Sequence, residues 1–200
     1  MNTDTMARSA SWERQTRETR IEGSLNLDGR GSCTIETPLG MWTHLLESFA
    51  FHGRFDLDLK AEGDTHVDGH HLVEDCGLVL GELFNRALGE RQDLVRAGCF
   101  LMPMDEALAQ TAVDLGGRPF LQYRASFSRP FAGELELDLL EDFWRAFADR
   151  ARANLVLLLL EGRSDHHRAE VLFKAMGRAL AQACRVLPQG GVSSIKEVVS

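Results

Sequence analysis

Two short runs in the sequence each carry two adjacent histidines followed by a glutamate. The runs are DGHHLVED and DHHRAE, and their candidate metal ligands are His70, His71 and Glu74, and His166, His167 and Glu170. If each run begins a helix, the first histidine and the glutamate are four residues apart and share one face. The second histidine then points to another side and would bind a different ion. Neutral imidazole with carboxylate suits manganese, iron or zinc.

The two runs occupy equivalent places in a repeated pattern. His166 follows His70 by 96 positions, and Gly177 follows Gly81 by the same number. Each run is preceded by a helical pattern and an apolar strand, over 41–63 and again over 139–162, and each is followed by a further helical pattern. A motif that recurs at the same place in a repeated unit indicates an internal duplication. This repetition favours a metal site over a chance pair of surface histidines.

The predicted fold is α+β, an internally duplicated sandwich with sheets on one side and paired helices on the other. We expect one domain with halves of about 14–93 and 94–190 and a C-terminal tail. Residues 1–13 are polar and without pattern, which predicts a loose extension.

Local signals predict turns and one shared strand face. Asp28-Gly29 is flanked by alternating apolar residues and predicts a hairpin. Turns are also expected at Pro103 and at Gly116-Gly117. In FDLDLKAEG, Phe55, Leu57 and Leu59 should share one face of a strand.

The bulk composition excludes several classes of partner. The chain has 200 residues, a net charge of −8 and 44% hydrophobic residues, which is typical of a globular protein with its own core. The acidic balance argues against nucleic acid or an anionic membrane as partner. No apolar run is long enough to span a bilayer, and no secretory signal is present, so a cytoplasmic location is expected. The four cysteines lack metal-binding spacing and predict buried thiols rather than disulfides.

Three aspartates near the histidine runs have two possible roles. Asp68, Asp75 and Asp165 could orient the imidazoles of metal ligands. They could equally be the negative charges that are common at helix starts, and for any one of them this second role is favoured.

Several motifs in order resemble the imidazoleglycerol-phosphate dehydratase family of histidine biosynthesis. They are ETRIEGSLNLDG, GDTHVDGHHLVED, PMDEALA, DLGGRPF and GRSDHHRAEVLFKAMGRAL, and the similarity runs from Arg14 to Lys196. The resemblance implies a duplicated α+β unit related to the second domain of ribosomal protein S5. It also implies trimers that assemble into a twenty-four-subunit shell, with active sites at subunit interfaces and two Mn²⁺ ions per site.

The same resemblance implies a reaction and assigns roles to residues. The reaction is loss of water from imidazole glycerol phosphate to give imidazole acetol phosphate, with both ring nitrogens bound to metal ions. His44 joins the six residues of the two runs as a metal ligand. Glu18 matches a glutamate that contacts substrate, and Glu18 and Glu170 are the candidates for proton transfer. The positions that hold the phosphate are His52, Arg96, Arg118, Ser194 and Lys196.

Five positions depart from the family pattern and leave two functions open. Val156 stands where a further metal-binding histidine is expected, ten residues before the second histidine pair. Thr43, Ser48, Gly69 and Leu72 replace an aspartate, a glutamine, an aspartate and a threonine. The chain is therefore either the dehydratase with one weakened metal position, or a divergent paralogue. Such a paralogue would keep the metal-binding shell but act on another phosphorylated substrate or on none. A generic metallohydrolase would explain neither the duplication nor the phosphate-binding residues.

Overall fold

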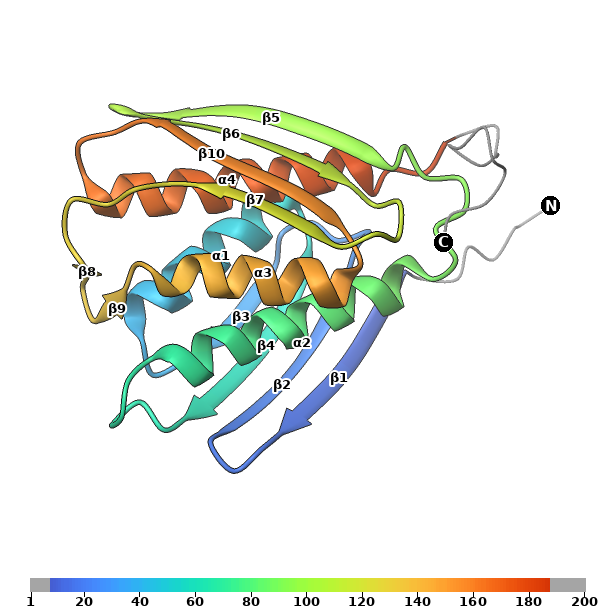
Figure 1. Cartoon of the computed structure of the whole chain (residues 1–200). Coiled ribbons are helices and arrows are strands. Elements are labelled where there is room, and N and C mark those ends of the chain that lie inside the picture. Colours follow the sequence, from blue (N-terminus) through green and yellow to red (C-terminus); the bar gives the residue numbers. More distant parts are fainter. Residues whose placement is uncertain (1–7, 188–200) are drawn as a thin grey trace.

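The structure, a computed structural model, describes residues 8–187, which form two four-stranded sheets with four helices between them (Figure 1). The elements of the first half are β1 (Ser9–Gln15), β2 (Thr19–Asn26), β3 (Cys33–Glu36), α1 (Gly40–Gly53), β4 (Asp56–Gly63) and α2 (His70–Leu88). Those of the second half are β5 (Ala97–Met104), β6 (Ala107–Asp114), β7 (Phe120–Arg124), α3 (Leu139–Ala151), β10 (Asn154–Glu161) and α4 (Asp165–Ala183). A short hairpin of β8 (Phe131–Ala132) and β9 (Leu135–Glu136) precedes α3.

The two sheets have the same topology. Their strand orders are β1-β2-β4-β3 and β5-β6-β10-β7. In each sheet the last pair is parallel, β3 with β4 and β7 with β10, whereas the other neighbours are antiparallel. Each parallel connection is made by a helix, as a parallel pair requires. The predicted duplication is therefore confirmed as a repeat of a whole sheet-plus-helix unit.

Within each half, the sheet lies on one side and its two helices on the other, as predicted. The halves then meet through their helices, so in the whole molecule both sheets are outermost (Figure 1). The close helix contacts cross between the halves: α1 packs against α4, and α2 against α3. A site built where these pairs meet takes its residues from both halves.

Alternation in the sequence decides which side chains face the helices. On β4, Leu57, Leu59 and Ala61 are buried, whereas the intervening Asp58 and Lys60 are exposed. Phe55 is also buried, just before the strand. The prediction of one shared apolar face is confirmed. The same period places Leu155 and Leu157 of β10 in the core, each with no exposed surface.

Glycines allow the helices to approach closely at equivalent points. A methyl group on Gly177 would lie 2.5 Å from the carbonyl oxygen of Phe49, and one on Gly81 would lie 2.7 Å from that of Phe147. Such distances leave no room for a side chain. The same helix crossing occurs in both halves, which explains why each glycine lies equally far along the chain from its histidine. The close contact also fixes the position of one helix along the axis of the other.

Three local predictions are wrong. The expected loose segment is a strand from Ser9 onward, because β1 pairs with β2 along its whole length. Asp28-Gly29 does not close a hairpin: β2 pairs with β1 and β4, and the Asp56 carboxylate holds the loop by accepting the backbone N–H groups of Arg30 and Ser32. Pro103 lies inside β5, an edge strand, where a missing donor is tolerated.

The remaining local predictions have mixed outcomes. The turn at Gly116-Gly117 is confirmed between β6 and β7. All four cysteines are free thiols; Cys76 and Cys184 are buried as predicted, but Cys33 is half-buried and Cys99 exposed. Of the helices within residues 8–187, none is long and apolar enough to cross a membrane.

Candidate functional site

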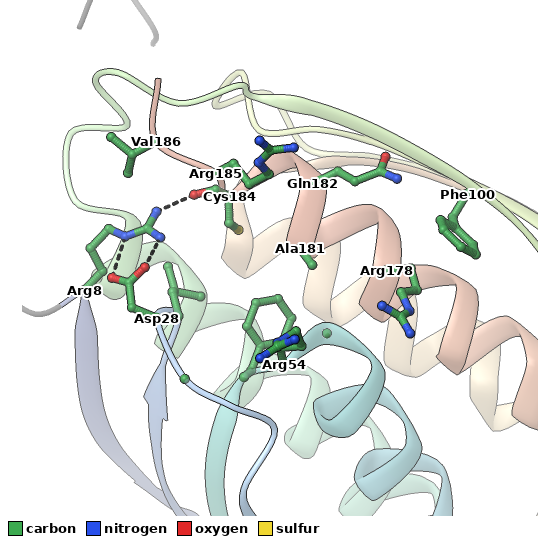
Figure 2. A pocket seen from close by; sticks show the side chains of 14 residues that line it. Arg8, Asp28, Arg54, Phe100, Arg178, Ala181, Gln182, Cys184, Arg185 and Val186 are labelled. Carbon is green, nitrogen blue, oxygen red and sulfur yellow. Dashed lines mark hydrogen bonds and ion pairs between the residues drawn. The ribbon is translucent and has the colours of Figure 1, made fainter. Parts of the chain in front are cut away.

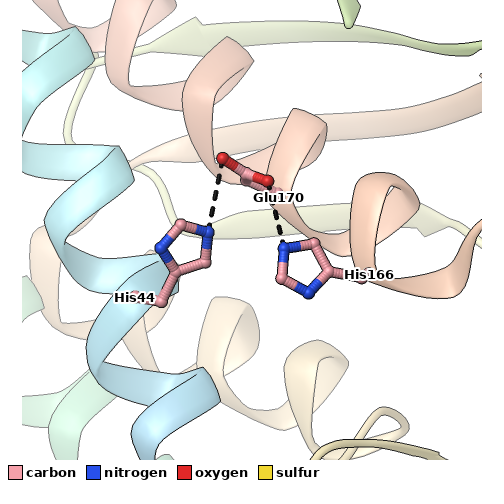
Figure 3. Close-up of side chains that lie close together, drawn as sticks. All are labelled: His44, His166 and Glu170. Carbon is pink, nitrogen blue, oxygen red and sulfur yellow. Dashed lines mark ion pairs between the residues drawn. The ribbon is translucent and has the colours of Figure 1, made fainter. Parts of the chain in front are cut away.

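The first candidate metal cluster joins α1 to α4. His44 comes from α1, and His166 and Glu170 lie one turn apart at the start of α4. His44 Nε2 is 3.3 Å from Glu170 Oε1, and His166 Nε2 is 3.3 Å from Glu170 Oε2 (Figure 3). The centres of the two imidazole rings are 5.3 Å apart. These three side chains, the α1–α4 cluster, could together hold one metal ion.

The electrostatics of the α1–α4 cluster fit a divalent ion. The side chain of Glu170 is only 11% exposed, and Lys174 Nζ lies 2.7 Å from its Oε1. Burial opposes ionisation, but Lys174 and then His44 outweigh it and hold the pKa of Glu170 below its usual range. His44 Nε2 is buried and makes no hydrogen bond, which is costly for a polar atom. An ion beside the charged Glu170 would satisfy that nitrogen.

A second cluster joins α2 to α3 at the equivalent place. His70 Nε2 lies 3.7 Å from Glu74 Oε2, and His70 Nδ1 lies 3.8 Å from Asp142 Oδ2. All three side chains are nearly half exposed. We call them the α2–α3 cluster; the two contacts use opposite ring nitrogens of His70, so they do not converge on one ion. The sequence motif identifies His70 and Glu74 but contains no signal for Asp142, which comes from the other half of the chain.

The second histidine of each pair is held by a carboxylate that sequence reasoning missed. His71 Nδ1 lies 3.1 Å from an Asp64 oxygen, and His167 Nδ1 lies 2.8 Å from Glu106 Oε2. The contact raises the pKa of His71, and the contact with His167 lowers the pKa of Glu106 to about 2. A carboxylate on Nδ1 fixes the ring and leaves Nε2 for a metal ion. Both rings are partly exposed, so a ligand outside this subunit could reach them.

His167 also takes part in a third grouping of possible donor atoms. Asp105 and Glu106, in the turn between β5 and β6, lie within ligand spacing of His167. Asp105 is 75% exposed and its Oδ2 is 4.0 Å from His167 Nε2. Because Glu106 already occupies Nδ1, this arrangement fits an oriented imidazole better than a separate closed site.

The three aspartates near the runs do not orient imidazoles. Asp68 accepts the backbone N–H of His70 at the start of α2. Asp75 is buried and pairs with Arg14 and Thr19, tying α2 to β1 and β2. Asp165 accepts the backbone N–H groups of Ser128 and Arg129. The favoured alternative, charge at a helix start, describes Asp68 and Asp165, and Asp165 also holds the loop before α3. Asp75 stabilises a tertiary contact instead.

The predicted phosphate-binding residues fall in two places. His52 lies two turns after His44 on α1; burial, Lys174 and Arg178 lower its pKa. Arg96 pairs with Asp114, and Arg118 also acts electrostatically on Asp114, so the two arginines lie near each other. The backbone of Arg96 contacts Ala183 at the end of α4, about 25 Å along that helix from His166. Ser194 and Lys196 lie outside the described residues.

Glu18 lies near the second histidine of the first pair. It is exposed in the turn between β1 and β2, and its backbone oxygen accepts the N–H of Asp64. Its charge contributes to the raised pKa of His71. The structure therefore brings Glu18 to His71 but not to the α1–α4 cluster.

The predicted loss of a metal ligand at Val156 stays a prediction. Val156 lies on β10 between Leu155 and Leu157, which face the helices, so its own side chain faces the opposite side of the sheet. A histidine there would not reach either cluster of this subunit.

The other departures have different consequences. Leu72 is fully buried and belongs to the core rather than to the site. Gly69 precedes His70 at the start of α2, where a side chain would meet Leu39. Ser48 Oγ lies 3.5 Å from Glu170 Oε1, which places it at the α1–α4 cluster. The hydroxyl of Thr43 is bonded to that of Thr37.

A basic hollow of about 560 Å³ lies at the other end of α1 and α4 (Figure 2). Arg54, Arg178 and Arg185 line it, and Arg8 binds Asp28 and the carbonyl oxygen of Cys184 across its rim. This ion pair raises the pKa of Arg8 and lowers that of Asp28. The hollow contains no histidine and none of the predicted site residues, so it is distinct from the metal clusters.

Comparison with known proteins agrees over nearly the whole chain. The sequence pattern of the family described as imidazoleglycerol-phosphate dehydratase matches residues 37–180. Proteins of that name from Limosilactobacillus fermentum and Roseiflexus sp. are each 48% identical, covering 96% of this chain and 100% and 98% of their own lengths. The crystal structure of the Staphylococcus aureus enzyme of that name superposes with a TM-score of 0.80 at 34% identity, covering 89% of this chain and 99% of its own. The Pyrococcus furiosus structure gives 0.80 at 32% identity, covering 94% and 99%.

Proposed function

The chain belongs to the imidazoleglycerol-phosphate dehydratase family, and on that premise we propose that it removes water from imidazole glycerol phosphate using two metal ions. It is a hydro-lyase of histidine biosynthesis. The observation that carries the proposal is the α1–α4 cluster, in which a charged, buried Glu170 faces two imidazoles. Manganese as the ion and a cytoplasmic location stay predictions.

The residues of the clusters would bind and orient the reacting groups. His44, His166 and Glu170 would hold one ion, and His70 with Glu74 a second. When bound, such ions act as Lewis acids that stabilise negative charge developing on an imidazole ring. Lys174 keeps Glu170 ionised at neutral pH, so its carboxylate can ligate or accept a proton.

Glu18 is the candidate to move the proton that the reaction must transfer. It is exposed, no ion pair holds its carboxylate among residues 8–187, and it lies beside His71. A substrate bound at His71 would therefore lie close to the Glu18 carboxylate, which could accept a proton from it.

The active site is proposed to be shared between subunits. His71 and His167 are partly exposed, and each is held through Nδ1 by a carboxylate outside the two clusters. Arg96 and Arg118, the candidate phosphate ligands, lie at the opposite end of α4 from His166. One subunit cannot bring these groups to one small substrate, which supports a homo-oligomer in which neighbours complete each site. Trimers assembled into a twenty-four-subunit shell would provide such interfaces.

Two inactive variants test the sharing of sites directly. Glu170→Gln removes a metal ligand, and Arg118→Gln removes a phosphate ligand. If the two groups act from different subunits, co-expression of both variants yields some intact sites and restores measurable activity. Activity no higher than that of the separate variants would show that each site uses one subunit only.

The alternative is a paralogue without dehydratase activity, which the changes at Val156 and beside His44 would favour. Val156 faces away from both clusters of its own subunit. A manganese-dependent assay for imidazole acetol phosphate decides between the two. We expect turnover by the purified protein, and turnover unchanged in a His66→Gln control, since His66 is an exposed histidine outside both clusters. No turnover at any manganese concentration would overturn the proposal.

A further inference from the structure

The two sheets can be compared strand by strand on their outer faces, the sides that point away from the helices (Figure 1). Asp56 of β4 pairs with Asn26 at the end of β2. Asn154 of β10 pairs in the same way with Asp114 at the end of β6. These pairs make β10 the counterpart of β4, position by position, up to the irregularity after Leu159.

The inner faces of β4 and β10 match in character, but their outer faces do not. Toward the helices, both strands present buried leucines at matching positions, namely Leu57 and Leu59, and Leu155 and Leu157. On the outer face, a charged pair on β4 is replaced by an apolar pair on β10, namely Asp58 and Lys60 by Val156 and Leu158. Because apolar side chains are stabilised by removal from water, this replacement favours a covered outer face on the second sheet alone.

The neighbouring strands continue the same difference between the sheets. Val156 pairs with Ala112 of β6, and Ala112 pairs with Cys99 of β5. The matching places on β2 and β1 are Ser24 and Ser11, which pair with each other. A row across the second sheet is therefore apolar where the corresponding row of the first sheet is polar.

The apolar surface on the second sheet is large enough for an interface. Leu101 of β5 and Phe120 of β7 are 56% and 57% exposed, and exposed apolar side chains that lie together mark interaction surfaces. Four strands about 4.8 Å apart, with about 3.3 Å per residue, give a face of roughly 500 Å². A typical partner buries about 800 Å². The polar members of the face, Gln110, Gln122 and Arg124, are of kinds that interfaces contain.

We propose that further copies of this chain cover the outer face of the second sheet, whereas the outer face of the first sheet stays in water. The identity of the partner rests on the proposed function, in which neighbouring subunits complete each active site. The candidate phosphate ligands adjoin this face: Arg96 pairs with Asp114 of β6, and Arg118 precedes Phe120 by two positions. Contact between copies here brings both arginines to a subunit boundary.

Charge also favours this face over the other for contact between copies. The chain has a net charge of −8. On the outer face of the first sheet, exposed acidic residues outnumber basic ones, with Glu13, Glu22, Glu36, Asp58 and Glu62 against Arg20 and Lys60. Like charges repel, so two copies would not associate readily through that face. On the second sheet, Asp114 and Arg124 have opposite charges, and the rows between them present little charge to a second copy.

Lysine at matched positions of the two sheets tests the inference in the full-length protein. Ala112→Lys and Ser24→Lys place the same charge on equivalent positions, and Leu158→Lys repeats what β4 already carries at Lys60. We expect Ala112→Lys and Leu158→Lys to sediment with at most about half the mass of the unmodified protein, since a symmetric assembly separates into whole subunits. Ser24→Lys should keep the full mass. Circular dichroism should show the same secondary structure in all variants.

The reactivity of Cys99 provides a second measurement that needs no substitution. Cys99 is exposed on the single subunit, so contact between copies should make it react with maleimide much more slowly in the native protein than in the unfolded chain. Folded Ala112→Lys and Leu158→Lys variants with the full mass would overturn the inference. So would a native Cys99 that reacts as fast as the unfolded one.

The dehydratase assay distinguishes failure of this inference from failure of the proposed function. Turnover by the unmodified protein, together with lysine variants that stay assembled, would reject the interface and keep the dehydratase. Dissociation by Ala112→Lys but not by Ser24→Lys, in a protein without turnover, would keep the interface and reject the dehydratase. If both hold, the dissociated variant should also lose turnover, because its neighbours no longer complete each site.

Discussion

The α1–α4 and α2–α3 clusters come from one duplicated unit but differ in burial, charge and restraint. Glu170 is 11% exposed and held by Lys174, whereas Glu74 is 47% exposed and has no lysine partner in the described part of the chain. His44 faces the first cluster, and Asp142 faces the second. The two halves thus share one backbone arrangement, whereas the side chains that face the first histidine of each pair differ. Two copies of a motif do not imply two equal metal positions.

The largest effect is expected from Glu170→Gln. The change removes the shared contact of His44 and His166 and leaves Lys174 beside a neutral group. We expect kcat/KM to fall by more than about 100-fold, because even partners outside direct contact with a metal cost about 10–100-fold. Glu74→Gln in the more exposed cluster should cost less. An equal loss of kcat/KM in the two variants, measured by steady-state kinetics, would show that the burial of Glu170 and its contact with Lys174 make no difference to its role.

Replacing the carboxylates that contact the second histidine of each pair should have intermediate effects. Glu106→Gln and Asp64→Asn each remove the group that orients an imidazole, His167 and His71 respectively. We expect manganese affinity to fall by about 10–100-fold, more for Glu106, whose contact is shorter. As a control, Glu22→Gln changes an exposed carboxylate on β2 that has only a 4.0 Å ion pair. Affinities equal to that control would show that these histidines are not ligands.

Replacing the glycine at either helix crossing should lower the stability of the protein by a similar amount. Gly177→Ala and Gly81→Ala place a methyl group 2.5 and 2.7 Å from a backbone oxygen, and overpacking of this kind costs about 1–3 kcal/mol. Thermal unfolding should show a lower Tm for both variants. Gly40→Ala, whose methyl group would meet only the flexible Glu134 side chain, should change the stability by less than about 0.5 kcal/mol. A loss confined to one half would show that the crossings are not equivalent.

The smallest effect concerns pH in the metal-free protein. Asp64 raises the pKa of His71 above its ordinary 6.5, so the folded state binds that proton more tightly than the unfolded state. This stabilisation is complete below the unfolded pKa and is lost as pH rises through the folded pKa. His52 has the opposite sign, because burial, Lys174 and Arg178 lower its pKa. NMR titration should give His71 a higher pKa than His52. Asp64→Asn should lower the pKa of His71 and leave that of His52 unchanged. A higher pKa for His52 than for His71 would contradict the contact between His71 and Asp64.

The sequence predicts well the fold and those site residues that lie within the two histidine runs. The histidine pairs, the strand alternation and the glycine repeat are periodic signals, and they lead to the duplicated architecture that the structure confirms. The pairing of β2 is not local: a turn signal at Asp28-Gly29 cannot show that β4 lies between β2 and β3. In the same way, Asp142 and Glu106 reach their histidines only through tertiary contacts. The side of the sheet that Val156 faces follows from its alternation with the buried Leu155 and Leu157.

Manganese content per subunit tests the central claim most directly. It can be measured by elemental analysis of the purified assembly, beside the Val156→His variant. Because both positions have ligands and Val156 faces away from them, we predict two ions per subunit in the unmodified protein and the same in the variant. One ion per subunit, rising to two in Val156→His, would contradict this prediction and identify Val156 as the position of a lost ligand.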